Sequence, residues 1–299
     1  MPDLQNVKII SPLQIDPGGE LGPFPFEFFE RACLAQGDSW FSIGAIPPTL
    51  TTNILDGLQL QKSTVVVNCA RPGKELTHMT DSATEPQFLQ QLTGNLARKW
   101  DAILISGIGN DAIDAAQSPP TSPVDRRLLL TASERVGDPG DGNAYLNEAG
   151  WTVFANHIAV VFDELVRRRN TGVNKSTPML FHNYSRLQPR PAPAGFGFGP
   201  WLQPSFSAFG IPQDAWLAVS DALMDRVDQL LRDLIAKHVA LDPSAALHRV
   251  NTRSADLVLA ALGSTGSSGD FQNEIHPTPA GYTKLAAVWG VAIQALPNW

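Results

Sequence analysis

The sequence predicts an α/β protein built around a mainly parallel sheet. Short runs of apolar residues alternate along the chain with longer segments whose apolar residues recur at every third or fourth position. The apolar runs are continuous, which is typical of strands covered by helices on both faces. A length of 299 residues and a hydrophobic content of 43% allow one large core.

The elements follow in order along the chain. Residues 1–30 contain Pro, Gly and Phe without a clear period, so we expect an N-terminal arm that packs on the domain. Residues 31–299 are then expected to form a single domain. The apolar runs predict five strands, at 32–36, 64–68, 102–106, 179–183 and 247–251. Helical spacing predicts helices over 88–100, 154–165, 216–235 and 279–295.

Two segments interrupt this alternation. Residues 118–143 are rich in Pro, Gly and Asp and are expected to be an insertion that ends with Asn143 capping the next helix. Residues 189–211 place large apolar side chains among Gly and Pro. Two interpretations of this second segment stay open: a flap over an active site, which we favour, or a loop whose aromatic residues pack into the domain. The residues concerned are Phe196, Phe198, Trp201, Leu202, Phe206 and Phe209.

Composition and charge exclude several classes of partner and location. The 29 acidic and 22 basic residues give a net charge of −7 without a basic stripe, so no nucleic-acid partner is expected. No uninterrupted apolar stretch reaches about 18 residues, so no membrane span is expected. The first residues lack the features of a secretory signal, and we expect a cytoplasmic location, although a chain whose signal had been removed would look the same. Cys33 and Cys69 are expected to be small core residues.

Chemistry-bearing residues cluster after the predicted strands. In open α/β sheets, ligands bind at the carboxyl ends of the strands. Three such segments and a fourth near the C-terminus carry candidate residues: Gly37-Asp38-Ser39-Trp40, Asn68-Cys69-Ala70-Arg71-Pro72-Gly73, Ser106-Gly107-Ile108-Gly109-Asn110-Asp111 and the ten residues from Asn273 to Tyr282. A serine hydroxyl becomes a useful nucleophile when an imidazole accepts its proton, and His276 is placed to supply one.

This set of segments, in this order, resembles the SGNH (GDSL-like) hydrolase family, which takes a Ser, a Gly, an Asn and a His from four separate blocks. The resemblance spans residues 37–282. It implies a three-layer α/β/α fold with a flavodoxin-like sheet of about five strands, and ester or thioester hydrolysis without a cofactor or metal. By the same resemblance Ser39 is the nucleophile and His276 the general base. The implied oxyanion donors are the backbone N–H of Ser39, the backbone N–H of Gly73 and the side-chain amide of Asn110.

Two positions depart from the family pattern. Ile108 stands where a glycine is usual, and Asn273 stands where the family has an aspartate three residues before the histidine. Three outcomes stay open: a Ser39–His276 dyad oriented by Asn273 or its backbone carbonyl, a triad completed by Asp270 or Glu274, or loss of catalysis. We expect the dyad, because a neutral acceptor can hold the ring when the oxyanion donors remain.

The expected function is hydrolysis of small or medium acyl esters through an acyl-enzyme intermediate. Alternatives stay open: a non-catalytic ligand-binding member of the fold, a thioesterase, an acyltransferase or a carbohydrate deacetylase. The expected partner is therefore a small-molecule acyl ester, and the sequence does not indicate an oligomeric state. We expect the substrate pocket to be lined by Trp40, Ile108, His182, Phe196, Phe198, Trp201 and Ile275.

Overall fold

The protein is built on one parallel sheet of six strands, in the order β2-β5-β3-β6-β7-β8. The computed structural model describes residues 3–15, 24–43, 52–195 and 197–299. A short antiparallel pair, β1 (Gln5–Asn6) with β4 (Gln59–Leu60), lies apart from this sheet. The main strands are β2 (Lys8–Ile10), β3 (Arg31–Gly37), β5 (Thr64–Asn68), β6 (Ala102–Ser106), β7 (Met179–His182) and β8 (Leu247–Val250). The α/β fold expected from the sequence is confirmed.

The five predicted strands are all present, and two of them, β5 and β6, have the predicted bounds. The sixth strand, β2, comes from the N-terminal residues, which were expected only as a packed arm. Its three residues pair with Val65, Val66 and Val67 at the edge of the sheet. A strand this short carries too few residues to show a period, so only the pairing with β5 reveals it.

Helices fill the connections between the strands. Among the described residues, none of them is long and apolar enough to cross a membrane. The helices are α1 (Pro86–Leu92), α2 (Gly109–Ala116), α3 (Glu148–Asn170), α4 (Gln203–Ala208), α5 (Trp216–Leu241) and α6 (Pro279–Gln294).

The first predicted helix is shorter than expected. The spacing predicted a helix as far as residue 100, but α1 ends at Leu92. The N–H groups of Thr93 and Gly94 both donate to the carbonyl of Leu89, which closes the helix. Trp100 is still buried, because it packs after the turn and donates from Nε1 to a backbone carbonyl of the helix. The buried Trp100 thus continues the apolar spacing of the helix beyond the residue at which the helix ends.

The predicted cap of α3 was also displaced. Asn147, rather than Asn143, caps this helix, and its side chain accepts from the N–H of Ala149. Asn143 lies one turn earlier, in a short 3-10 helix whose own cap is Asp141. The insertion therefore makes one more turn than the sequence pattern indicated.

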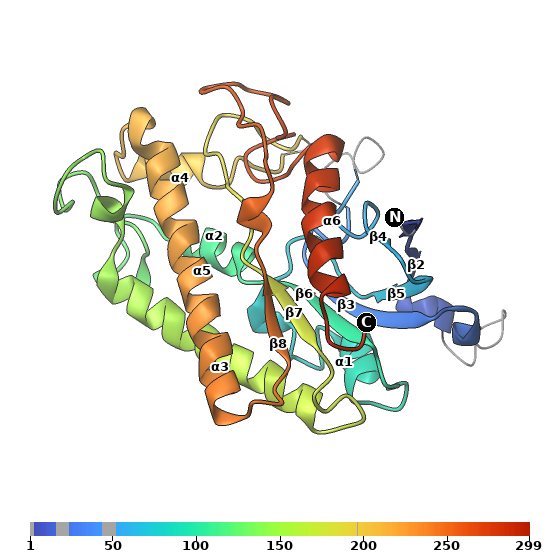
Figure 1. Ribbon diagram of the computed structural model, residues 1–299. Coiled ribbons are helices and arrows are strands. Elements are labelled where there is room, and N and C mark those ends of the chain that lie inside the picture. Colours follow the sequence, from blue (N-terminus) through green and yellow to red (C-terminus); the bar gives the residue numbers. More distant parts are fainter. Residues whose placement is uncertain (1–2, 16–23, 44–51, 196) are drawn as a thin grey trace.

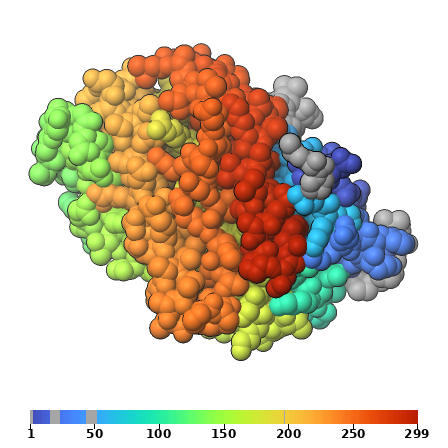
Figure 2. Space-filling model, viewed as in Figure 1, coloured from blue at the N-terminus to red at the C-terminus, as the bar shows by residue number. Residues whose placement is uncertain are grey.

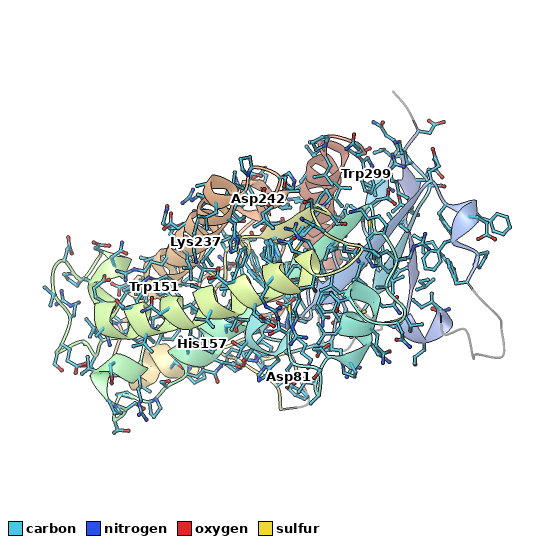
Figure 3. The ribbon with its side chains drawn as sticks, turned by 90° about the horizontal axis from the view of Figure 1, so that it is seen from below. Asp81, Trp151, His157, Lys237, Asp242 and Trp299 are labelled. Carbon is cyan, nitrogen blue, oxygen red and sulfur yellow. The ribbon has the colours of Figure 1, made fainter. Side chains whose placement is uncertain are left out.

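The direction of side chains on β7 shows which helices cover which face of the sheet. Phe181 packs against α3, whereas the next residue, His182, packs against Trp289 of α6. Helix α6 crosses in front of the strands in Figure 1. Helices α3 and α5 run side by side, joined by the ion pair of Lys237 with Asp163 (Figure 3). The layers are thus helix, sheet and helix, as the resemblance implied.

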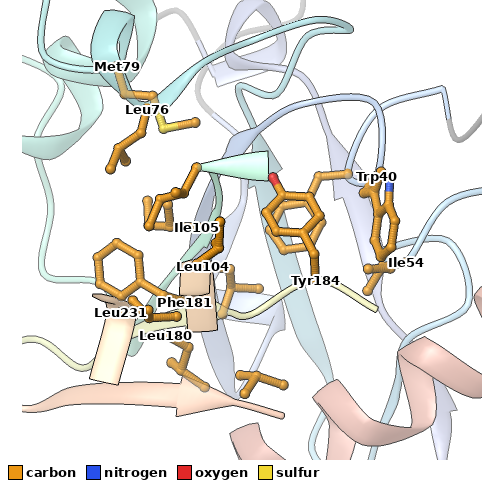
Figure 4. Close-up of a cluster of buried hydrophobic side chains, with 14 of the residues drawn as sticks. Trp40, Ile54, Leu76, Met79, Leu104, Ile105, Leu180, Phe181, Tyr184 and Leu231 are labelled. Atoms are coloured by element: carbon orange, nitrogen blue, oxygen red, sulfur yellow. The ribbon is translucent and has the colours of Figure 1, made fainter. Parts of the chain in front are cut away.

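The main core lies between these layers, and its upper part reaches the carboxyl ends of the strands. Figure 4 shows Leu104 and Ile105 of β6 and Phe181 of β7 in one cluster, with Trp40 beside Tyr184. Both Trp40 and Tyr184 belong to segments that follow a strand. Residues just beyond the strand ends are therefore held by the packed core below them.

Candidate active site

Ser39 lies in the tight turn that follows β3. The N–H of Phe41 donates to the carbonyl of Asp38, and the N–H of Ser42 donates to the carbonyl of Ser39. A Cβ at Gly37 would lie 2.6 Å from the Cβ of Ser106 on the neighbouring strand. The glycine of the Gly-Asp-Ser motif is therefore needed for close approach of β3 and β6, and it sets the position from which the turn begins.

His276 meets this serine although the two residues are 237 positions apart. Ser39 Oγ lies 2.7 Å from His276 Nε2, and both residues are buried. His276 precedes α6, whose cap, Thr278, accepts from the N–H of Gly281. The structure thus brings together the two side chains that the sequence analysis paired.

Asn273 holds the other side of the imidazole. Its Oδ1 lies 3.1 Å from His276 Nδ1 and also accepts from the backbone N–H groups of Ile275 and His276. Because Oδ1 accepts these backbone protons, the amide orientation is determined, and His276 Nδ1 is the donor in the third contact. Nε2 is then the unprotonated nitrogen that faces Ser39 Oγ.

The two carboxylates considered for a triad are engaged elsewhere. Asp270 accepts from Lys284 Nζ at 2.7 Å and from the N–H of Val258. Glu274 accepts from backbone N–H groups of the segment around Leu202. Within the described part of the chain, no carboxylate hydrogen-bonds to the His276 imidazole, so the only side chain on its Nδ1 is that of Asn273.

Burial determines the charge state of this histidine. Desolvation lowers the pKa of His276 to about 3, because the charged imidazolium would lose its water without gaining a carboxylate partner. At neutral pH the imidazole is therefore unprotonated, which is the form a general base requires. The same environment gives little stabilisation to the imidazolium that forms when it accepts a proton.

The predicted oxyanion donors lie in one connected unit. Asn110 begins α2 with Gly109, and its Nδ2 donates to the carbonyl of Lys74 at 3.0 Å, which uses one of its two amide protons. Asp111 accepts from the N–H groups of Leu76 and Thr77, so the start of α2 and the segment after Gly73 are bonded together. The roles of Gly73 and Asn110 as donors stay predictions.

The backbone at Gly73 has a conformation that favours glycine. Its φ is +73°, in the left-handed region, and an added Cβ would meet no protein atom within 4 Å. The turn conformation, rather than contact with another part of the chain, therefore favours glycine here.

Ile108 occupies the position where the family pattern has glycine, and its backbone is glycine-like. Its φ is 81°, which is unusual for a β-branched residue and costs about 1–3 kcal/mol. The side chain is buried, and burial offsets part of that cost. The departure in sequence thus leaves the local backbone in the conformation that a glycine would adopt, just before Asn110.

A second serine–histidine contact lies beneath the turn. Ser106 Oγ is 2.8 Å from His182 Nε2 and donates to Asp38 Oδ1 at 2.8 Å. Here the serine lies between the acid and the imidazole, whereas in a catalytic triad the imidazole lies between the serine and the acid. Ser106 is also 0% exposed, so no substrate carbonyl reaches it. This group is an internal support for the Ser39 turn, which the sequence analysis did not identify.

Asp38 is the centre of that support. Its carboxylate accepts from Ser106 Oγ, from the Tyr184 hydroxyl and from the N–H of Trp40. Desolvation raises the pKa of Asp38 to about 6, although these three hydrogen bonds act in the opposite direction. The ring of Tyr184 in turn packs against Gly109, where an added Cβ would lie 2.5 Å from the ring. The network therefore ties the Ser39 turn to the start of α2.

Most of the residues expected to line a substrate pocket are packed in the interior. Four of them are at most 4% exposed, and their roles as lining residues stay predictions: Trp40, Ile108, His182 and Ile275. Phe196 lies outside the described residues. Phe198 is 54% exposed, and the Trp201 ring lies 5.4 Å from the His276 ring, centroid to centroid. Trp201 is therefore the predicted lining residue that contacts the dyad.

The segment 189–211 combines both interpretations that the sequence left open. Leu202, Phe206 and Phe209 are buried in the core, as expected for a loop that packs into the domain. Among the described residues of this segment, Trp201 packs on the His276 ring. Phe206 lies on α4, and Leu202 and Phe209 cap its two ends, so these three side chains pack inward, and a flap over the site stays a prediction.

Comparisons with known proteins find similarity among solved structures. Neither a protein-family model nor a curated protein matches the sequence. The chain is similar to solved ester hydrolases. A lipase from a goat rumen metagenome is 13% identical, with a TM-score of 0.47 over 88% of this chain and 97% of that one. Phospholipase A1 from Streptomyces albidoflavus is 14% identical, with a TM-score of 0.45 over 88% and 99%.

Two further structures extend this similarity. An acetylxylan esterase from Geobacillus stearothermophilus is 13% identical, with a TM-score of 0.44 over 88% of this chain and 94% of that one. A protein from Slackia heliotrinireducens, described as an SGNH hydrolase, is 17% identical, with a TM-score of 0.39 over 88% and 98%. At these identities the likeness concerns the fold, and the chemistry of this chain has to be argued from its own site.

Proposed function

We propose that this protein is a serine-dependent hydrolase of carboxylic esters, with Ser39 as nucleophile and His276 as general base. The contact of 2.7 Å between Ser39 Oγ and His276 Nε2 carries this proposal. It is supported by the contact of His276 Nδ1 with Asn273 Oδ1, which leaves Nε2 free to accept a proton.

In the first half-reaction, Ser39 Oγ attacks the acyl carbon while its proton passes to His276 Nε2. The carbonyl oxygen becomes negative, and the N–H groups of Ser39 and Gly73 with the remaining amide proton of Asn110 are proposed to stabilise it. The intermediate collapses when His276 returns the proton to the departing alcohol. An acyl group then remains bonded to Ser39 Oγ.

In the second half-reaction, water replaces the alcohol. His276 Nε2 accepts a proton from that water, whose oxygen attacks the acyl carbon and releases the carboxylic acid. Ser39 recovers its proton from the imidazolium. Throughout, Asn273 keeps Nδ1–H directed away from Ser39, so that the same nitrogen serves in both steps.

Labelling with a fluorophosphonate probe tests this proposal. We expect one covalent adduct, which peptide mass spectrometry places on Ser39, and turnover of p-nitrophenyl acetate or butyrate in a screen of chain lengths. A folded protein that takes no label and hydrolyses no ester in the screen contradicts the proposal. That outcome, with binding of an ester retained, favours a ligand-binding role instead.

Asn273→Asp should move the acid limb of activity to higher pH. In the natural chain the pKa of His276 is lowered to about 3, so protonation of this base should not lower kcat/KM until the pH approaches that value. A fall near pH 7 that both proteins share is assigned to Glu274, whose pKa burial raises to about 7. A carboxylate beside Nδ1 favours the imidazolium and raises this pKa by about 1–3 units. The base then becomes protonated, and inactive, at a higher pH. The measurement is kcat/KM against pH for both proteins.

Asn183→Asp is the matched control for this experiment. Asn183 is buried like Asn273, but it bonds to Asn251 and Thr252 rather than to the imidazole. Its acid limb should stay where the natural chain has it. Equal shifts of the acid limb in the two variants show that a buried charge at either position is enough to change the pH profile. An acid limb that does not shift in Asn273→Asp contradicts the assignment of Asn273 as the partner of His276.

A further inference from the structure

Two buried charged side chains fasten the segment 189–211 to the loop that carries His276. The first is Arg190, which is 2% exposed. Its guanidinium donates to the carbonyls of Ser264, Phe271 and Asn273. All three carbonyls lie in the part of the loop that precedes His276. In Figure 2 a small yellow group of atoms, from the segment after β7, is enclosed by the orange of the C-terminal third.

The second is Glu274, which stands between Asn273 and Ile275 and is 0% exposed. Its carboxylate accepts from three consecutive backbone N–H groups, those of Trp201, Leu202 and Gln203. The N–H groups of Leu202 and Gln203 lie 2.8 and 2.6 Å from its oxygens. A buried carboxylate with several backbone donors is a strong local constraint. Glu274 thus determines where the backbone of Trp201 lies.

The position of Trp201 matters because its ring packs on the catalytic base. The two rings of Trp201 and His276 are 5.4 Å apart at an interplanar angle of 82°. Among the described residues, the hydrogen-bond partner of His276 Nδ1 is the neutral amide oxygen of Asn273. A charged partner would orient the ring more strongly than an amide does. Lateral packing by Trp201 therefore supplies a second restraint on the direction of His276 Nε2.

We infer that Glu274 is a positioning residue, which holds Trp201 against His276 and so keeps Nε2 directed at Ser39. This inference rests on the proposed function. Glu274 does not touch the reacting atoms; it acts through the backbone of Trp201 and the ring contact. The carboxylate that the sequence placed among candidates for the triad thus serves the base from the opposite side, through another segment of the chain.

Glu274→Gln tests this inference against Asp228→Asn, which also changes a buried carboxylate to an amide. Asp228 pairs with Arg249 between α5 and β8 and touches neither site loop. Burial raises the pKa of Glu274 to about 7, so the assays are run at about pH 8.5, where its carboxyl group is ionised. Glu274→Gln should lower kcat about tenfold to a hundredfold while KM changes by less than about twofold. Asp228→Asn should change neither.

Two readouts report the positioning itself. Hydrogen exchange at the amides of Trp201, Leu202 and Gln203 should accelerate in Glu274→Gln and not in Asp228→Asn. The NMR shift of the His276 ring proton should move in Glu274→Gln, because the Trp201 ring current acts on it. Unchanged exchange and an unchanged ring shift overturn the inference even if activity falls.

Trp201→Ala keeps the experiment decisive if Glu274→Gln does not fold. It removes the ring and leaves the backbone donors to Glu274 in place, so it should lower kcat to a similar extent. In the double variant the two losses should not add, because both act through one contact. Natural kcat in Trp201→Ala overturns the inference. If the natural protein has no esterase activity, the proposed function fails by itself, and the exchange and NMR results still judge the contact.

Discussion

Ser39→Ala should lower kcat/KM for ester hydrolysis by about a thousandfold or more, because it removes the atom that forms the acyl-enzyme. KM should change little, since the hydroxyl contributes little to binding of the ground state. Steady-state kinetics with the ester that the natural protein hydrolyses fastest measures this loss. Fluorophosphonate labelling should disappear in the same variant.

Ser106→Ala is the companion variant, because it alters the other serine that contacts a histidine. Ser106 supports the turn through Asp38 but is closed to solvent, so activity should fall by no more than about tenfold. Labelling at Ser39 should persist. If Ser106→Ala loses both labelling and activity while Ser39→Ala keeps them, the nucleophile has been assigned to the wrong serine.

His276→Ala should cost about a thousandfold in kcat, because the proton of Ser39 then has no acceptor within hydrogen-bond distance. The rate of fluorophosphonate labelling should fall in parallel, since labelling uses the same activated hydroxyl. Stopped-flow and labelling time courses measure both. A general base acts in the chemical step, so its removal should lower kcat. A variant in which KM rises while kcat is unchanged indicates a binding role for this side chain instead.

His238→Ala is the control for that measurement. His238 lies on α5 and bonds to Asp163 of α3, so its removal affects helix packing without reaching the site. Activity should stay at the natural level at temperatures where the variant is folded. A loss comparable to that of His276→Ala, at a temperature well below the melting temperature, contradicts the assignment.

The fold was largely predictable because most of its central strands are largely apolar runs, although β8 has two polar residues between Leu247 and Val250. Strands β5 and β6 have the bounds that the runs 64–68 and 102–106 indicated. The strand β2 was missed because three residues show no period, and α1 was overestimated because the buried Trp100 continues its spacing beyond the helix. The second error arises because burial, which creates the apolar pattern, is not confined to regular elements.

The candidate site was predictable as a set of residue types at strand ends. Ser39 directly follows β3, whose place the predicted sheet gives, and the family resemblance paired it with His276, which precedes α6. The direction of side chains was less accessible. Trp40 and Ile275 were expected to line a pocket, and their side chains are 2% and 4% exposed, an outcome of packing that the order of residues does not show.

By itself the sequence determined the parallel sheet, the edge at which its polar segments gather and the serine and histidine that meet there. These features depend on local hydrophobic runs and on the order of the segments along the chain, and both can be read directly from the sequence. Only the tertiary structure decided that Asn273 contacts the imidazole, that Glu274 binds the backbone around Trp201 and that Ser106 lies beneath the nucleophile. Those contacts depend on side-chain direction and on pairings such as Glu274 with Leu202, 72 residues apart, which no local pattern encodes.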